Sequence, residues 1–428
     1  MGAEWAPTPD ASFFTSEQSK GGVVETEVRY DLDRRVALHP LVYLADGDEV
    51  TIGRPDIDSY GIFPADGAEV VRRLADGNTP HEVDRWYQAE YGEAADFEHI
   101  LAALEELDFI VVAERAPVEV APVRLQRLGA ALFSAPAWIC YIALLTWAVV
   151  AMVRTPDLIP NYSHLFFTDY LTLIELALFA GALPQLFLHE AFHVLAARRL
   201  GVRSRVSIGR RFYYVVLETS LDGLVAVPRR KRYLPILAGM LVDLLALAAL
   251  TVTADLNRNP DGSYSLVGRV CLALAFATLL RVLWQFFFYL RTDLYVLMST
   301  LLGCVDLHTT AKRLLRNRAM RLLRRPDRIT DETQWHPVDR RAAGWYSWLI
   351  VAGYTFSATT FVVGVAPAVY QMFASSISRL LGGATTGRQI LDSAVFLGMN
   401  LGQIAFTVWL AVRERQQRKN EKFQHVIA

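Results

Sequence analysis

The sequence predicts a mainly α-helical, polytopic membrane protein of about six transmembrane helices, with a small α+β, winged-helix-like domain at its N-terminus. Of its 428 residues, 53% are hydrophobic and 20% are charged. From residue 129 onward, apolar runs approach the roughly twenty residues that an α-helix needs to cross a bilayer. The preceding part is polar and mixed. This contrast predicts a soluble domain followed by a membrane domain.

Changes in composition along the chain predict six segments. A stretch rich in Pro, Ser, Thr and Gly opens the sequence and is expected to be a mobile tail. The expected order is a tail (1–22), a small domain (23–115), a linker (116–128), a membrane core (129–325), a C-terminal transmembrane pair (326–413) and a cytoplasmic tail (414–428).

The small domain is expected to contain three strands followed by three helices. Turn signals separate the strands, which we place at residues 36–44, 49–53 and 60–63. A first helix is expected over residues 66–74. Thr79 and Pro80 then predict the cap and first residue of a second helix, and Asp96 predicts the cap of a third.

Six apolar runs are long enough to cross a membrane, at residues 130–153, 171–197, 234–253, 266–290, 345–373 and 390–412. Arginines gather in the segments 198–211, 229–232 and 313–325, whereas the loops 155–170 and 255–264 contain few basic residues. The positive-inside rule therefore places both termini in the cytoplasm, with the chain in the lipid bilayer of the cytoplasmic (inner) membrane.

His189, Glu190 and His193 form an H-E-x-x-H motif inside the second apolar run. Residues four apart lie on the same face of a helix, so both imidazoles can bind one zinc ion while Glu190 acts as a general base. Charged and imidazole groups are costly in an apolar segment and are usually kept there for function. The alternative is a polar cluster at a helix end near the membrane interface. The motif predicts the zinc helix of a metalloprotease.

A catalytic zinc normally has three protein ligands, and two aspartates compete for the third position. Asp261 lies in a short loop predicted at the outer face, a bilayer's thickness from the motif. Asp293 follows the fourth apolar run, on the same predicted side as His189 and His193. We therefore favour Asp293 and keep Asp261 as the alternative.

Residues 130–325 resemble the M50, or site-2 protease-like, zinc peptidases. The resemblance rests on the H-E-x-x-H motif, on the stretch 228–243, which is similar to a helix that lines the site in that group, and on Asp293-Leu-Tyr. The last is similar to an Asp-Gly-Tyr ligand motif, with Leu294 in place of the glycine. The resemblance implies that His189, His193 and Asp293 are metal ligands and that Glu190 is the base.

Residues 34–112 resemble the PqqD-like fold, a peptide-recognition element of ribosomal peptide natural-product pathways. The matching pieces are the turn at 53–55, the helix junction at 74–79 and the closing stretch 104–109. The resemblance implies that a leader peptide adds as a strand beside the third strand, where it would contact Tyr60, Ile62 and Phe63. The alternative is a small fold that anchors or regulates the membrane part.

Two further features of the membrane part are expected to matter. The stretch 206–219 is rich in β-branched and aromatic residues and predicts a hairpin or edge strand. Phe212 and Tyr214 could then hold a substrate backbone in extended form, or the strand could simply pack on the helices. Asp243 and Arg281 are charges deep in consecutive apolar runs, and we expect them to pair.

Composition narrows the class of function. The net charge is only −1, and the arginines lie beside apolar runs, which argues against a nucleic-acid partner. The three cysteines form no C-x-x-C pair and are expected to be small core residues. The sequence predicts a membrane-embedded zinc (Zn2+) endopeptidase that processes a ribosomally made precursor peptide. Two alternatives stay open: cleavage of a membrane-anchored regulator, and a non-catalytic peptide-binding scaffold or exporter component.

Overall fold

The computed structural model describes residues 30–46, 49–57, 59–111, 123–211, 214–220, 223–224, 227–333, 335–382 and 386–427. The predicted tail and most of the predicted linker lie outside these residues. The protein is mainly helical, with a small three-stranded antiparallel sheet near its N-terminus. The coarse architecture predicted from the sequence is therefore confirmed.

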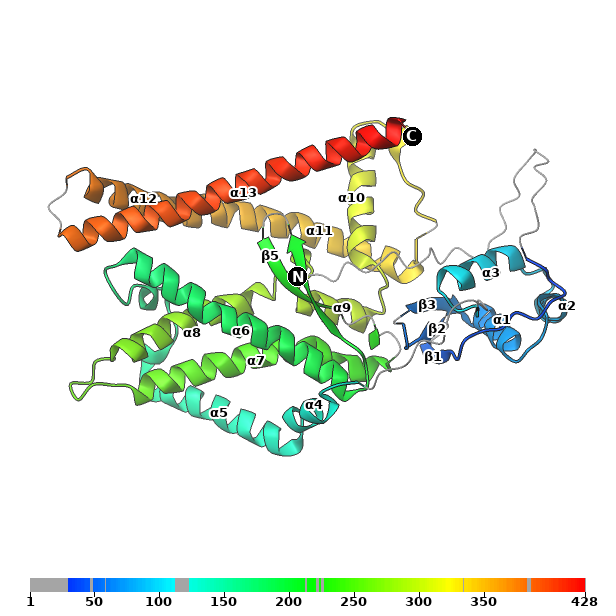
Figure 1. Cartoon of the computed structure of the whole chain (residues 1–428), viewed down its shortest axis with the longest axis horizontal. Coiled ribbons are helices and arrows are strands. Elements are labelled where there is room, and N and C mark those ends of the chain that lie inside the picture. Colours follow the sequence, from blue (N-terminus) through cyan, green and yellow to red (C-terminus); the bar gives the residue numbers. More distant parts are fainter. Residues whose placement is uncertain are drawn as a thin grey trace.

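The small N-terminal domain (Figure 1, right) contains three strands and three helices. The strands β1 (Val42–Asp46), β2 (Glu49–Arg54) and β3 (Ser59–Pro64) pair in the order β1-β2-β3. The helices are α1 (Ala65–Ala75), α2 (Pro80–Tyr91) and α3 (Phe97–Glu106). The apolar stripe of each helix and one face of the sheet bury a common core that includes Ile52, Val70, Leu74, Leu101, Leu104 and Phe109.

The helix starts of this domain follow the predicted capping signals. Thr79 and Glu82 form a capping box at the start of α2, and the Asp96 carboxylate accepts a hydrogen bond from the His99 N–H at the start of α3. The predicted first strand was too long. It begins at Val42, because Pro40 lacks the N–H that a ladder needs, and the preceding Leu38 forms only an isolated bridge with Ile110.

Six helices of the described residues are long and apolar enough to cross a membrane. They are α5 (Ala135–Arg154), α6 (Leu171–Arg199), α7 (Arg229–Leu256), α8 (Leu266–Trp284), α11 (Pro337–Thr360) and α13 (Gly387–Ile427). A short helix α4 (Gln126–Leu132) precedes α5. These helices are consistent with the predicted multi-pass membrane protein. One side chain differs from expectation: Cys140 on α5 is exposed rather than in the core.

Two predicted spans end differently from what hydropathy alone indicated. The fourth ends at Trp284 and is followed by the turn η4 (Phe288–Leu290) and the short helix α9 (Asp293–Leu302). The fifth is broken after Thr360 by the π-helical turn η6 (Phe361–Val365), which leads into α12 (Ala366–Leu380). An apolar run indicates which residues can lie in lipid, but it does not indicate where the helix is interrupted by a turn or a π-helical segment. Hydropathy alone therefore did not predict either break.

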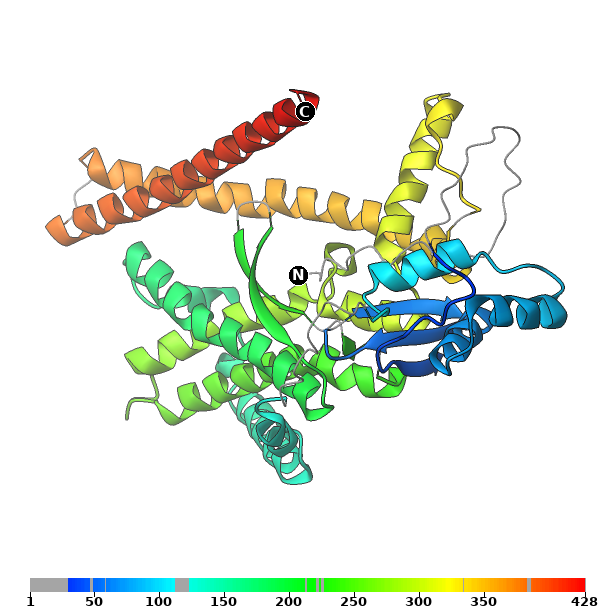
Figure 2. The same cartoon turned by 45° about the vertical axis from the view of Figure 1, so that its right-hand side comes forward.

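The membrane helices form two layers (Figures 1 and 2). Helices α5 to α8 make one bundle, and α11, α12 and α13 make a second layer across from it. Between them lies an antiparallel hairpin of β4 (Arg205–Arg211) and β5 (Tyr214–Ser220), which confirms the predicted hairpin. Helix α9 is followed by α10 (Leu307–Leu322), and the two axes differ in direction by 87°.

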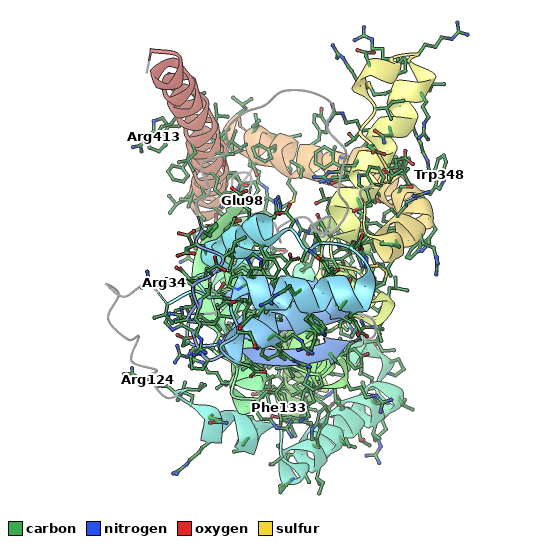
Figure 3. The ribbon with its side chains drawn as sticks, turned by 90° about the vertical axis from the view of Figure 1, so that its right-hand side faces the viewer. Arg34, Glu98, Arg124, Phe133, Trp348 and Arg413 are labelled. Atoms are coloured by element: carbon green, nitrogen blue, oxygen red, sulfur yellow. The ribbon has the colours of Figure 1, made fainter. Side chains whose placement is uncertain are left out.

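The soluble domain contacts the membrane part through polar groups. In Figure 3 it lies in front of the helices. The His336 Nε2 atom is 2.7 Å from Glu49 Oε1. The Arg203 guanidinium donates a hydrogen bond of 2.8 Å to the Asp56 carbonyl oxygen. The domain is thus held against two separate segments of the membrane part, one before β4 and one before α11.

Candidate metal centre

Helix α6 carries the H-E-x-x-H motif close to its C-terminal end. His189, Glu190 and His193 are all buried, and only 1% of His189 is exposed. The four-residue spacing places both imidazoles on one face of the helix, as predicted. The two Nε2 atoms lie 3.2 Å apart.

Asp293 approaches the same pair of imidazoles from the first position of α9. Its Oδ2 atom is 3.2 Å from His189 Nε2 and 3.4 Å from His193 Nε2. Gln285 helps to fix this position, because its side-chain oxygen accepts a hydrogen bond from the Asp293 N–H. The structure therefore brings the three predicted ligand residues together.

The separations between the three ligand atoms fit a metal ion. Tetrahedral zinc with nitrogen and oxygen ligands at 2.0–2.1 Å requires ligand atoms about 3.3 Å apart, close to the 3.2 to 3.4 Å found here. Among the described residues, no hydrogen-bond donor reaches the buried Oδ2 atom of Asp293. A buried, unsatisfied carboxylate oxygen is costly, and a cation between it and the imidazoles would remove that cost.

Both imidazoles are oriented through their Nδ1 atoms. His193 Nδ1 lies 2.8 Å from the Pro235 carbonyl oxygen, and His189 Nδ1 lies 3.0 Å from Asp243 Oδ2. A carbonyl and a carboxylate are acceptors, so each Nδ1 donates its proton. In the neutral imidazole, each Nε2 then has a free lone pair, which is the tautomer that a metal ligand needs.

Asp243 belongs to a buried polar network. The Arg281 guanidinium bonds both of its carboxylate oxygens, at 2.6 and 3.0 Å, which confirms the predicted pair. Arg281 also donates to the side-chain oxygen of Gln185, which accepts a second hydrogen bond from Thr278. The sequence analysis missed the contact of Asp243 with His189. Its one available signal was that an intramembrane carboxylate is by default a functional candidate.

Gly239 on α7 leaves open space at the imidazoles. A Cβ atom at this position would lie 2.3 Å from His193 Nε2 and 2.5 Å from His189 Nε2. No side chain can therefore be accommodated here without moving the candidate ligands. Sequence reasoning did not single out Gly239, because small residues are common in transmembrane helices.

Asp261 does not take part in this group. It lies exposed in the loop between α7 and α8, where its Oδ1 atom accepts hydrogen bonds from the N–H and hydroxyl of Ser263. Asp261 therefore stabilises a turn in which the next residue, Gly262, has a positive φ, and this local role explains an aspartate at the position.

The structure places four of the five residues that were predicted to contact a peptide, and the fifth lies outside the described residues. Tyr60, Ile62 and Phe63 lie on β3, which is the last strand in the order β1-β2-β3 of the described sheet. Phe63 also packs against the core of the domain. Phe212 lies outside the described residues. Tyr214 begins β5, and its contact with substrate stays a prediction.

No protein-family model, curated protein or solved structure matches this chain. Its fold and site define it as a multi-pass helical protein with a His2Asp group that could hold a metal ion.

Proposed function

We propose that this protein is a membrane-embedded zinc endopeptidase of the M50-like kind. The observation that carries the proposal is the convergence of His189, His193 and Asp293 at metal-ligand separations, with both imidazoles in the ligand tautomer. A site of two imidazoles and one carboxylate suits zinc and leaves one position for a reactant, as in catalytic rather than structural zinc sites.

The residues of the site divide the chemistry between them. Bound zinc would supply Lewis-acid polarisation of the scissile carbonyl and of the attacking water. Glu190, which directly follows His189 and is buried, accepts the proton of that water and delivers it to the leaving amine. Asp243 and the Pro235 carbonyl keep the imidazoles oriented during this transfer. Gly239 has no side chain that would displace the imidazoles.

The proposed substrate is a precursor peptide whose leader is recognised by the N-terminal domain. Because β3 is an outer strand of the described sheet, the leader would add beside it as a further strand. The hydroxyl of Ser59 donates to the Leu107 carbonyl, which places the end of α3 beside β3 and forms a second wall for a peptide. The contacts of Glu49 and Asp56 with the membrane part support delivery of a bound peptide to the candidate metal centre.

The test combines metal analysis with one substitution. Purified wild-type protein is expected to contain one zinc ion per chain. Glu190→Gln is expected to retain the zinc and to cleave a co-encoded precursor peptide at least about a hundredfold more slowly, because the general base is lost. Glu175→Gln is the matched control, since this glutamate lies on the same helix and accepts its hydrogen bond from Asn400.

Each alternative function has its own outcome in this test. A non-catalytic scaffold or exporter component would bind the peptide without zinc and without cleavage in the wild type. Zinc-dependent cleavage of a membrane-anchored regulator, with the precursor left intact, would indicate the other type of substrate. Unchanged cleavage by Glu190→Gln would contradict the role of Glu190 as the base.

A further inference from the structure

Helix α10 has a strongly basic exposed side that the proposed peptidase does not use. We define the α10 basic surface as the exposed residues Lys312, Arg313 and Arg316 of α10 together with Arg324 and Arg325, which follow its C-terminal end. Their neighbour Arg321 is instead paired with Glu332. The opposite side of α10 is buried against α11.

Two leucines at the end of α10 are exposed among these arginines. The exposed fraction is 85% for Leu322 and 62% for Leu323. Exposing two adjacent large apolar side chains to water is unfavourable by about 25 cal/mol per Å². A partner for this surface must therefore combine negative charge with an apolar layer.

Helix α10 runs crosswise to the candidate membrane helices (Figures 1 and 2), and a helix crosswise to membrane-spanning ones lies close to the membrane plane. The elbow after α9 turns the chain by 87°, and α10 runs across the start of α11 (Figures 1 and 2). It lies near the ends of the membrane helices that face the soluble domain. Figure 3 shows nitrogen-tipped side chains that project from α10 away from the rest of the molecule.

Hydrogen bonds from α9 and α11 hold the elbow. The Asp339 carboxylate accepts hydrogen bonds from the N–H groups of Val305 and Asp306, at 3.1 and 2.9 Å. The Tyr295 hydroxyl accepts one from the N–H of His308 at the start of α10. Because both flanks of the turn are fixed in this way, the basic surface keeps its orientation with respect to the helix bundle.

We propose that α10 is an interfacial helix whose basic surface binds the headgroups of anionic phospholipids, while Leu322 and Leu323 insert into the apolar layer beneath them. Juxtamembrane arginines and lysines are attracted to anionic lipid, and an interfacial helix buries apolar side chains at the same depth. An acidic peptide would match the charge but would leave the leucines exposed. This proposal depends only on the multi-pass fold and stands apart from the peptidase.

The test measures lipid preference with the full chain in phosphatidylcholine nanodiscs. The probes are spin-labelled phosphatidylglycerol and spin-labelled phosphatidylcholine, whose motionally restricted fractions give a relative association constant. The wild type is expected to prefer phosphatidylglycerol, and less so at high salt because salt screens these charges. The triple variant Arg316→Gln/Arg324→Gln/Arg325→Gln is expected to lower the preference by up to about fivefold per arginine.

A matched control removes three exposed arginines from the soluble domain, Arg34→Gln/Arg35→Gln/Arg85→Gln, and is expected to keep the wild-type preference. Polyglutamate is the probe for an acidic protein partner. Leu322→Ser/Leu323→Ser keeps every charge and is expected to weaken the association of phosphatidylglycerol, but not the binding of polyglutamate. Equal association of the two lipids with the wild type would overturn the proposal. So would a triple variant that loses polyglutamate binding while its lipid preference is unchanged, because the surface would then belong to an acidic protein partner.

Discussion

Asp243 joins the candidate metal centre to the surrounding helices, because one carboxylate contacts both His189 and Arg281. A carboxylate that accepts from a ligating imidazole fixes its tautomer and raises its basicity, and its loss typically weakens metal affinity by about 10- to 100-fold. We therefore expect Asp243→Asn to bind zinc about that much more weakly in a chelator competition. Asp255→Asn is the control, since this aspartate is on the same helix and pairs with Arg258 at the protein surface.

The same substitution leaves Arg281 without its carboxylate, which by itself destabilises a buried site. The double variant Asp243→Asn/Arg281→Gln removes that unpaired charge and separates the two effects. Weak zinc binding in a folded double variant is expected if Asp243 acts on His189. Recovery of wild-type affinity would show that Asp243 matters only for folding.

We expect opposite effects on zinc content when Asp293 and Asp261 are each replaced by alanine. Asp293→Ala removes a ligand atom that lies within 3.4 Å of both imidazoles, so stoichiometric zinc should be lost. Asp261→Ala removes hydrogen bonds only to Ser263 in an exposed turn, so zinc content should stay at one ion per chain. Elemental analysis of the two purified variants decides between them. Zinc retained by Asp293→Ala would contradict the assignment of the third ligand.

Gly239 gives a steric test that changes no charge. In Gly239→Ala the added methyl group would lie 2.3 to 2.6 Å from the ligand imidazoles, which must then move. We expect zinc affinity to fall sharply while the helical content stays unchanged. Gly344→Ala is the matched control, because a Cβ atom at this helical glycine meets no neighbour within 4 Å. Equal zinc affinities of the two variants would show that zinc binding does not need the close approach of Gly239 to the imidazoles.

At the scale of elements, the start of α6 depends on a residue far along the chain. The Asp392 carboxylate on α13 accepts hydrogen bonds from the Leu171 and Thr172 N–H groups, each at 3.0 Å. It acts as an N-cap supplied by another helix. We expect Asp392→Ala to lower the free energy of unfolding by about 2 kcal/mol, measured by thermal unfolding in detergent.

A local cap provides the comparison for this prediction. Ser265 caps α8 from within its own segment, through a hydrogen bond from the Gly268 N–H. Ser265→Ala should cost about 1 kcal/mol and leave α13 in place. Asp392→Ala should in addition loosen α13 from α6, seen as a larger spin-label distance between the two helices. An unchanged distance would show that Asn400 and its bond to Glu175 suffice to hold α13.

At the scale of the whole molecule, contact between the soluble domain and the membrane part should depend on pH. The hydrogen bond with Glu49 raises the pKa of His336 above its ordinary value of 6.5, against the opposing effect of burial. A raised pKa means that the contact contributes fully below about pH 6.5, and that this contribution is lost as the pH rises through the higher pKa of the docked state.

The distribution of distances between a spin label on the N-terminal domain and one on the membrane part should therefore broaden at alkaline pH. His336→Gln is expected to make the distribution independent of pH over this range, whereas His81→Gln should not, since His81 pairs with Asp33 of the same N-terminal domain. A pH response that persists in His336→Gln would assign the effect to another group.

The cytoplasmic placement of both termini stays a prediction.

The sequence by itself determined the features that depend on near neighbours in the chain. The apolar runs, the caps at Thr79 and Asp96, the hairpin and the two imidazoles on one helix face all follow from spacing of a few residues. Topological reasoning about sides of the membrane also favoured Asp293 over Asp261, and the structure brings Asp293 to the imidazoles.

Only the tertiary structure decided which distant groups meet. Asp243 lies 54 residues from His189, and Asp392 lies 220 residues from Thr172, yet each pair is in hydrogen-bond contact. The clearance at Gly239 likewise depends on how closely α7 packs against α6. Such contacts follow from the rotation and depth of whole helices in the bundle, which the periodicity of a single apolar run does not specify because any of its faces can pack inward.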